Sequence, residues 1–352
     1  MFSLPDLGWN PALEEAFAPF RAEGLVPARV AIQHPKLYTL YAERRELLAR
    51  VSGRFRHGSR SVADFPVTGD WVAIRPRPAE GTATIHAVLP RRSRFTRKSP
   101  GDATEEQILA ANVDTVFLVM GLDGNYNPRR LERYLALAWE SGAAPVVLLT
   151  KPDLCPDAEE RKRTTERLGV PVLVVSPKHG EGFEGLTHYL VPGKTLALLG
   201  SSGVGKSTLV NRLLGEERLA TRPVRESDDR GRHTTTHREL IVLPGGSLVI
   251  DTPGLREIQL WESADVDGAF ARVTNLAEAC RFTDCGHDTE PGCAVTGAIA
   301  EGSLDPAQLA SYQKLKKEQE HLHVLRDLRA QLDQKRKWKS ITRLAKRHKP
   351  RE

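Results

Sequence analysis

The stretch LALLGSSGVGKSTLVNRLLG, residues 196–215, decides how the middle of this chain folds. An apolar run suited to a buried strand precedes Gly200, and residues 207–214 have the character of a helix. Between them, GSSGVGKS matches G-x-x-x-x-G-K-[ST], whose glycines let successive backbone N–H groups curl around phosphates. The order of strand, glycine-rich loop and helix predicts a phosphate-binding loop.

Each residue of this loop has an expected role beside a nucleoside triphosphate. The Lys206 ammonium should meet the β- and γ-phosphates, and the Ser207 hydroxyl should ligate Mg²⁺. The N-terminus of the following helix adds a partial positive charge. The candidate nucleotide-binding residues are Gly200, Ser201, Ser202, Gly203, Val204, Gly205, Lys206, Ser207 and Thr208.

Two downstream segments fit a sensor of the γ-phosphate. The motif DTPG, residues 251–254, ends the apolar run SLVI; there the Asp251 carboxylate suits the magnesium shell, and the Gly254 N–H can meet the γ-phosphate. Between the phosphate loop and DTPG, the segment RGRHTTT supplies a threonine for the magnesium ion, and either Thr234 or Thr235 suits that role. The expected magnesium ligands are therefore Ser207, one of these threonines, and Asp251.

A base-reading motif lies upstream of the phosphate loop. TKPD, residues 150–153, follows the run VVLL and resembles the guanine-reading pattern N-K-x-D, with threonine in place of asparagine. Its aspartate can accept hydrogen bonds from two guanine N–H groups, which adenine cannot satisfy. SPK, residues 176–178, stands where S-A-K would be; proline has no N–H, so a contact to guanine O6 must come from a neighbour such as Lys178. The candidate guanine-binding residues are Thr150, Lys151, Asp153, Ser176, Pro177 and Lys178.

The rest of the chain divides into three further regions. Five short strands are expected at 25–33, 36–42, 46–55, 69–76 and 82–89, after a short helix at 12–20. Five strands favour an OB-fold barrel, which often binds nucleic acid, although a barrel used only for packing has the same pattern. The stretch 91–104 reads as a basic linker. Apolar strands at 113–121, 145–153, 170–178, 194–200 and 247–254, with a helix at 129–142, then predict a parallel, helix-covered sheet.

Three of the four cysteines crowd together after the last strand. Cys280-x4-Cys285-x-His287-x5-Cys293 offers three thiolates and one imidazole. In a cytosolic chain this crowding favours a metal over disulfides, and the donor set matches structural Zn²⁺ of the Cys₃His type. Cys155 reads as an ordinary buried residue. A charged helix should begin at Asp305-Pro306.

The charge distribution points to a polyanionic partner. The net charge is +6, and residues 335–352 contain nine Lys or Arg and one Glu. Such a run is either a solvated tail or a contact to RNA; a second basic segment at 91–98 favours RNA. No apolar run approaches the roughly 20 residues that span a bilayer, and no secretory signal is visible at the N-terminus. We therefore expect a cytoplasmic protein with no membrane partner.

The order TKPD, SPK, phosphate loop, threonine segment and DTPG is that of a GTPase domain cut and rejoined. With the barrel and the cysteine spacing, GSSGVGKST, GRHTTT and DTPG resemble the circularly permuted, small ribosomal subunit-dependent GTPases of the RsgA (YjeQ) family. The resemblance implies a multidomain fold: an N-terminal OB-fold β-barrel, a central circularly permuted P-loop GTPase α/β domain and a C-terminal helical zinc-binding domain. The expected boundaries are an extension at 1–24, an RNA-binding barrel at 25–98, the GTPase domain at 99–265, and the zinc domain with its basic tail at 266–352.

The resemblance also implies the activity and its partners. It implies hydrolysis of GTP to GDP stimulated by the 30S subunit, binding to 16S rRNA, and a role late in subunit maturation. We expect Mg²⁺ with the nucleotide, one structural zinc and a monomer. The glutamine that positions water in Ras-like enzymes is missing after DTPG, and the resemblance points instead to His233 as the catalytic residue. His233 could instead contact RNA or solvent.

Two rival functions use the same motifs. A nucleotide-gated RNA-binding module with negligible turnover fits the missing glutamine and the basic segments. A P-loop kinase or ATPase is disfavoured by Asp153, which selects guanine. Hydrolysis of GTP measured with and without 30S particles, with ATP as the control, separates the three.

Overall fold

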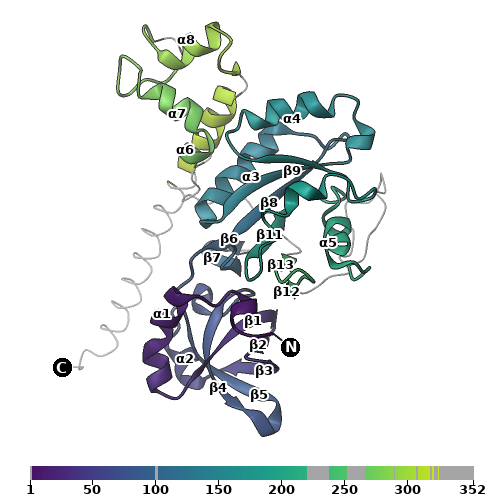
Figure 1. The fold of residues 1–352 in the computed structure, drawn as a ribbon. Helices are drawn as coiled ribbons and strands as arrows, with labels where there is room; N and C mark the ends of the chain where they lie inside the picture. The colour runs from purple at the N-terminus through teal and green to yellow at the C-terminus, as the bar shows by residue number, and fades with distance from the viewer. Residues whose placement is uncertain are drawn as a thin grey trace, which may run out of the picture.

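The computed structural model describes residues 2–99, 102–219, 238–251, 266–288, 290–306, 308–317, 319–320 and 324. The strands are β1 (Val26–His34), β2 (Leu37–Ala42), β3 (Arg45–Val51), β4 (Trp71–Arg77), β5 (Thr82–Val88), β6 (Arg94–Ser99), β7 (Asp102–Ala111), β8 (Thr115–Gly121), β9 (Ala144–Thr150), β10 (Val172–Val175), β11 (Thr195–Leu199), β12 (Glu239–Val242) and β13 (Leu248–Asp251). The α-helices are α1 (Pro11–Ala22), α2 (Gly53–Gly58), α3 (Pro128–Ser141), α4 (Ala158–Glu166), α5 (Lys206–Leu214), α6 (Val266–Ala269), α7 (Ala271–Ala277) and α8 (Ala294–Ala300). Figure 1 shows a barrel and a group of short helices at opposite ends of a central sheet.

The five N-terminal strands close into a barrel. They pair in the order β1-β2-β3-β5-β4, and β4 pairs back onto β1. The β3–β5 pair is parallel and the others are antiparallel, with α2 between β3 and β4 in the chain. This is the predicted OB-fold barrel, although the expected third strand ends early because its last residues form α2.

The segment before the barrel packs onto it. Asn10 caps α1 by accepting a hydrogen bond from the Leu13 N–H. Phe17 on α1 is fully buried, and the ring of Trp9 lies edge-on to Trp71 of β4 at 4.8 Å between centroids. The predicted helix is therefore present, and it contributes to the core beneath the barrel.

The central sheet has the strand order β10-β9-β8-β11-β13-β12, parallel throughout except for β12. β11 lies between β8 and β13, so strands that come earlier in the chain occupy one side of it. Alternate residues face different cores: Val116 and Leu118 join the core under α3, whereas Phe117 and Val119 join the core that contains α5. The sheet is covered on both faces, as expected for a parallel sheet.

The stretch 91–104 is not a linker, because its residues contribute to two paired strands. β6 and β7 form an antiparallel hairpin, which Figure 1 shows between the barrel and the central sheet. Arg91, expected in a nucleic-acid-binding run, is instead mostly buried. Its guanidinium pairs with both carboxylate oxygens of Asp70 at 2.7 and 2.8 Å and donates to the carbonyls of Ala63 and Phe65.

The barrel and the central sheet are joined by a pair of strands and by the buried side chain of Arg29. β1 pairs with β12, which places both parts in one continuous hydrogen-bonded sheet. Arg29 on β1 is 2% exposed and donates hydrogen bonds to the carbonyls of Leu7, Gly69 and Asn112 and to Thr195 Oγ1 on β11. Burial lowers the pKa of Arg29 to about 10, so the group stays charged at neutral pH.

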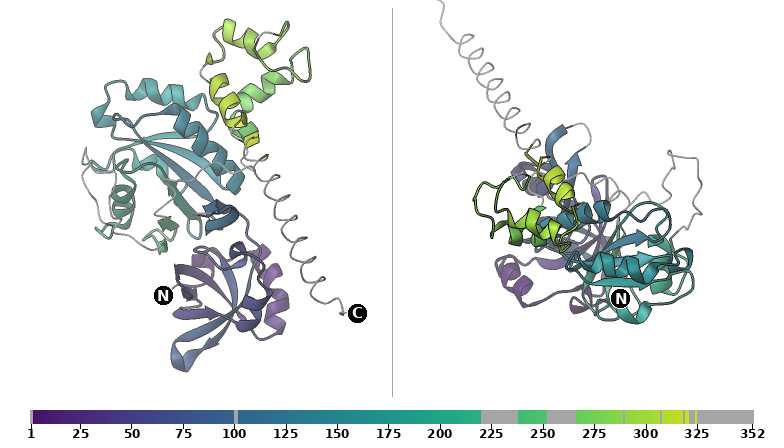
Figure 2. Two further views of the ribbon diagram at one scale, coloured as in Figure 1. Left: turned by 180° about the vertical axis from the view of Figure 1, so that it is seen from behind. Right: turned by 90° about the horizontal axis from the view of Figure 1, so that it is seen from above.

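The C-terminal region is helical in its described part. α6 packs against α3 of the central domain, and α7 packs against α8 (Figure 2). A helical turn follows Asp305, as its Asp-Pro sequence predicts. Within the described part of the chain, no helix combines the length and apolar character needed to cross a membrane.

Candidate nucleotide site and metal cluster

The parallel strands of the central sheet bring the predicted nucleotide-binding segments to one edge. Gly121 at the end of β8 pairs with Thr150 at the end of β9, and Val175 of β10 also pairs with Thr150. Leu199, the last residue of β11, pairs with Leu118 of β8. The loops after these strands, which carry TKPD, SPK and the phosphate loop, therefore meet at the carboxyl edge, where ligands bind in open α/β sheets.

The phosphate loop joins β11 to α5 as predicted. A side chain on Gly200 would collide with the carbonyl oxygen of Val119, and Gly205 has a φ of 98°, so both positions require glycine. The Lys206 ammonium donates to the carbonyls of Gly200 and Ser201, at 2.6 Å each. Ser202, Gly203 and Val204 complete the loop, and Ser207 and Thr208 lie in the first turn of α5.

Thr150 ties the base-reading motif to the phosphate loop. It is fully buried, and its Oγ1 donates a 2.6 Å hydrogen bond to the carbonyl of Val204. The threonine that replaces the expected asparagine thus makes a hydrogen bond between the two motifs. The backbone then turns through Lys151, which has a left-handed φ of 58°.

Lys151 is held by Asp123, a residue that the sequence analysis missed. The Lys151 ammonium lies 2.6 Å from Asp123 Oδ2, and both side chains are about one-fifth exposed. Burial raises the pKa of Asp123, but the hydrogen bonds from Lys151 and from the Asn125 N–H outweigh it and lower the pKa below its usual value. The available signal was its position just after β8, beside the end of β9.

The SPK loop faces the TKPD loop. His179 Nε2 lies 4.0 Å from Asp153 Oδ2, and both side chains are more than one-third exposed. Ser176 is buried, and its hydroxyl has no hydrogen-bond partner in the described part of the protein. A buried hydroxyl of this kind costs free energy unless water or a ligand satisfies it.

The backbone of the SPK loop has two N–H groups available next to Pro177, which has none. The Ser176 N–H donates to the Glu181 carbonyl, and the N–H groups of Gly180 and Glu181 donate to the Ser176 carbonyl. None of the hydrogen bonds found in this loop uses the N–H of Lys178 or that of His179, and both residues are exposed. Lys178 stays the predicted contact to guanine O6, and the N–H of His179 is available beside it.

The structure describes only one of the predicted switch residues, Asp251. Asp251 ends β13, next to the strand that leads into the phosphate loop, so its backbone lies at the carboxyl edge of the sheet. His233, Thr234, Thr235 and Gly254 lie outside the described residues. Their predicted roles rest on the sequence.

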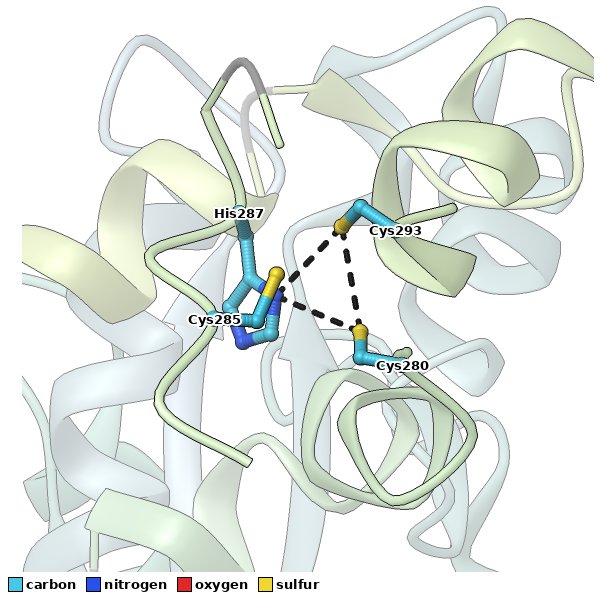
Figure 3. Close-up of side chains that lie close together, drawn as sticks. All are labelled: Cys280, Cys285, His287 and Cys293. Carbon is cyan, nitrogen blue, oxygen red and sulfur yellow. Dashed lines mark hydrogen bonds between the residues drawn. The ribbon is translucent and has the colours of Figure 1, made fainter. Parts of the chain in front are cut away.

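The Cys₃His cluster lies beside α7 and α8, at the opposite end of the molecule from the barrel (Figure 1), and Figure 3 shows its four side chains close together. The donor atoms of Cys280, Cys285, His287 and Cys293 all lie within 4.8 Å of one another. His287 Nδ1 is 3.6 Å from Cys280 Sγ and 3.5 Å from Cys293 Sγ, and those two sulfurs are 3.8 Å apart. Zn–S and Zn–N bonds of about 2.3 and 2.0 Å place tetrahedral donors about 3.5–3.8 Å apart. The donor set therefore fits zinc.

Local structure prepares one of these thiols to ionise. Cys293 is the N-cap of α8, where its sulfur accepts from the Thr296 N–H at 3.4 Å. Burial opposes ionisation, but the hydrogen bonds with Thr296 and His287 outweigh it and lower the pKa of Cys293 to about 6. A thiolate is the form that binds metal, so Cys293 is the sulfur most readily available, whereas burial and the neighbouring sulfurs raise the pKa of Cys285 to about 11.

Comparisons with known proteins agree with this architecture. A family model described as RsgA GTPase matches residues 88–261, and one described as 50S ribosome-binding GTPase matches residues 195–347. The small ribosomal subunit biogenesis GTPase RsgA of Opitutus terrae is 50% identical over 351 residues, covering 96% of each chain. The protein of the same name from Syntrophotalea carbinolica is 46% identical, covering 98% of this chain and 97% of its own.

Solved structures show the same fold. The crystal structure of YjeQ from Thermotoga maritima matches with a TM-score of 0.64 and 26% identity, over 84% of this chain and 98% of that one. YloQ, described as a circularly permuted GTPase, matches with a TM-score of 0.62 and 21% identity, over 84% and 96%, which supports the fold alone. With near-complete coverage by relatives at such identity, the chain belongs to the RsgA family of ribosome-biogenesis GTPases.

Proposed function

We propose that this GTPase hydrolyses GTP slowly alone and quickly on the small ribosomal subunit, binds 16S rRNA, and acts late in 30S maturation. The observation that carries the nucleotide chemistry is the hydrogen bond from Thr150 to the Val204 carbonyl, because it joins the base-reading and phosphate-binding motifs into one site. We propose the small subunit as the partner because the relatives are named small ribosomal subunit biogenesis GTPase RsgA.

The nucleotide is held by groups at the carboxyl edge of the sheet. Asp153 accepts from the guanine N–H groups, the Lys178 N–H donates to O6, and Lys151 packs along the base while Asp123 fixes its ammonium. Lys206 exchanges its loop carbonyls for the β- and γ-phosphates. The remaining predicted guanine contacts, Thr150, Ser176 and Pro177, shape the pocket around these groups.

The magnesium ligands and the catalytic residue come from segments on either side of β12 and β13. Hydroxyl and carboxylate oxygens of Ser207, Thr234 or Thr235, and Asp251 form the hard donor set that Mg²⁺ prefers. Magnesium, when bound, neutralises phosphate charge as the γ-phosphoryl group leaves. The Gly254 N–H meets the γ-phosphate, and His233 orients or deprotonates the attacking water.

We assign the Cys₃His cluster to one structural zinc ion, bound by Cys280, Cys285, His287 and Cys293. The barrel and the basic tail are the proposed RNA-binding parts, and the protein acts as a cytoplasmic monomer. The proposed boundaries are 25–98 for the barrel, 99–265 for the GTPase domain and 266–352 for the zinc domain.

Phosphate release from GTP, measured with and without purified 30S subunits and with ATP as the control, tests the proposal. Strong stimulation of GTP hydrolysis and no turnover of ATP are expected. His233→Ala should lose the stimulated rate while keeping GTP affinity. Nucleotide-dependent binding to 30S particles without phosphate release would favour the RNA-binding module instead, and equal rates with and without 30S would overturn the proposal.

A further inference from the structure

A cleft of about 1120 Å³ lies where the barrel meets the end of α3. Its walls are the end of α1, α2 with the loop that follows, the end of β5, residues 90–94, and residues 140–142 at the C-terminal end of α3. The volume exceeds the range of about 300–1,000 Å³ typical of small-molecule pockets. None of the described residues that line it belongs to β2 or β3, the strands on which OB-folds ordinarily hold nucleic acid.

The barrel side of the cleft carries unpaired positive charge. Five arginines and three acidic residues line the cleft. Arg91 and Arg92 are committed to ion pairs with Asp70 and Asp114. Arg54 is different.

Arg54 on α2 and Arg60 just after it are exposed, and their guanidinium groups have no hydrogen-bond or ion-pair partner within the described ranges. Of the acidic lining residues, Asp64 is occupied by its own loop, since its Oδ2 accepts from the N–H groups of Arg60 and Ser61. Two guanidinium groups therefore face the cleft with their donors available to a phosphate.

The cleft also offers aromatic and neutral polar surface beside these charges. Phe55 on α2 is half-buried and lies edge-on to Phe65, with 5.9 Å between ring centroids. Burial lowers the pKa of His86 on β5, and the neighbouring Arg75 and Arg54 lower it further. A neutral imidazole keeps one donor and one acceptor for a base edge.

We propose that this cleft binds a single-stranded RNA segment, with Arg54 and Arg60 at the phosphates and Phe55 against a base. Free guanidinium groups next to partly exposed aromatic rings are the means by which proteins hold single strands. The inference rests on the rRNA binding proposed above, and adds the surface that makes the contact. It places the RNA on the α2 side of the barrel, next to the GTPase domain.

The test compares two double variants in the full-length protein. Arg54→Ala with Arg60→Ala removes the two cleft charges; Arg45→Ala with Arg50→Ala removes two exposed charges from β3, outside the cleft. The probe is a labelled oligouridine of about 12 nucleotides, within the site sizes of OB-folds. Binding is measured over a range of salt concentrations, and 30S binding is measured in parallel.

The cleft variant should bind the oligouridine at least about tenfold more weakly, and its slope of log K against log salt should fall by about 1.4, since each lost single-strand phosphate contact removes about 0.7. The β3 variant should match the wild type. Phe55→Leu should weaken binding roughly tenfold at an unchanged salt slope, because stacking carries no counterion release. Unchanged thermal melting confirms that each variant is folded.

The opposite ranking, in which the β3 variant loses binding and the cleft variant keeps it, would place the RNA on the usual strand face and overturn the cleft. Equal binding by both variants, or preference for a duplex of the same length, would also overturn it. If the wild type binds neither the oligouridine nor 30S particles, the proposed rRNA binding has failed as a whole, which is a different result from failure of the cleft alone.

Discussion

Two regions of this molecule collect groups suited to charged ligands, and they are assembled in opposite ways. The Cys₃His cluster takes its four donors from one short segment, Cys280 to Cys293. The nucleotide site joins segments that are distant in the chain: Thr150 and Val204, which share its central hydrogen bond, are 54 residues apart. We therefore expect the cluster to depend on a bound metal ion for its local structure, whereas the nucleotide site depends on the sheet that positions its loops.

The largest effect should come from the cluster. Cys280→Ala should abolish bound zinc and loosen residues 266–320, because structural zinc contributes about 10–16 kcal/mol in isolated zinc-finger peptides. GTP affinity should persist, since the sheet does not need the ion. Metal analysis and limited proteolysis are the measurements. Cys155→Ala, which removes a buried thiol of the central domain, is the control and should retain the metal. Loss of GTP affinity together with zinc would show that the two regions do not separate.

A smaller but sharp effect is expected at the base-reading aspartate. Asp153→Asn removes the acceptor of two guanine N–H groups, each charged hydrogen bond being worth about 1.5–3 kcal/mol. GTP affinity should fall by about 100-fold or more, while affinity for xanthosine triphosphate rises, because the new amide can donate to its C2 carbonyl. Competition against a fluorescent GDP analogue measures both. Asp157→Asn, an exposed neighbour, should change neither; an unchanged preference for guanine in Asp153→Asn would remove Asp153 from the site.

The connection between the two regions carries a pH dependence. Glu132 on α3 is 5% exposed, its Oε2 lacks a hydrogen-bond partner among the residues described, and burial raises its pKa from 4.5 to about 7. The folded state therefore holds a proton that the unfolded state releases, so the free energy of unfolding should fall by up to about 3 kcal/mol as pH rises from about 4.5 to 7.

Glu132→Gln should remove this slope in urea unfolding measured at about pH 5 and about pH 8. Glu159→Gln, on the surface of α4, serves as the control and should keep the slope. α3 of the sheet domain packs against α6 of the C-terminal helical region. If unfolding occurs in two transitions and only one depends on pH, the C-terminal helical region unfolds separately from the sheet. A wild type whose stability is flat over this range would contradict the assignment.

The smallest expected effect is at the hydrogen bond between the two nucleotide-binding motifs. Thr150→Val keeps the side-chain shape and leaves the Val204 carbonyl without its donor, at a cost of about 1–3 kcal/mol. GTP affinity should fall about tenfold or more, with zinc content unchanged. Thr150→Ser retains the hydroxyl and should bind GTP nearly as well as the wild type. Equal loss in both variants would show that the methyl group matters, rather than the hydrogen bond.

The sequence was informative where the signal is local. The phosphate loop, the Cys₃His spacing, the barrel strands and the helix before them each follow from residues that are close in the chain. The permuted order of the sheet could also be predicted, because its motifs are each recognisable alone. The chemistry of a glycine-rich loop or a metal donor set does not depend on distant partners.

Most of the misses involve partners that are far apart in sequence. The residues next to Arg91 give no sign that it pairs with Asp70. The sequence therefore predicts that Arg91 belongs to a nucleic-acid-binding run, whereas it forms a structural ion pair. An exception is the stretch 91–104, which the sequence predicts to be a linker because charged and small residues outnumber apolar ones there. It contains β6 and the start of β7, which are neighbours in the chain. Asp123 contacts Lys151, and His179 lies near Asp153, because the strands that precede these residues are neighbours in the sheet. The sequence alone does not show that these strands are neighbours.

The pairing of β1 with β12 means that the boundary between the barrel and the GTPase domain is not a place to cut the protein. β12 is bordered by β13 on one side and by β1 on the other. Deleting the barrel would expose the backbone of β12 as an open edge, and exposed edges recruit strands from other chains. An isolated GTPase domain should therefore self-associate, so the barrel also protects β12 from pairing with a strand of another chain.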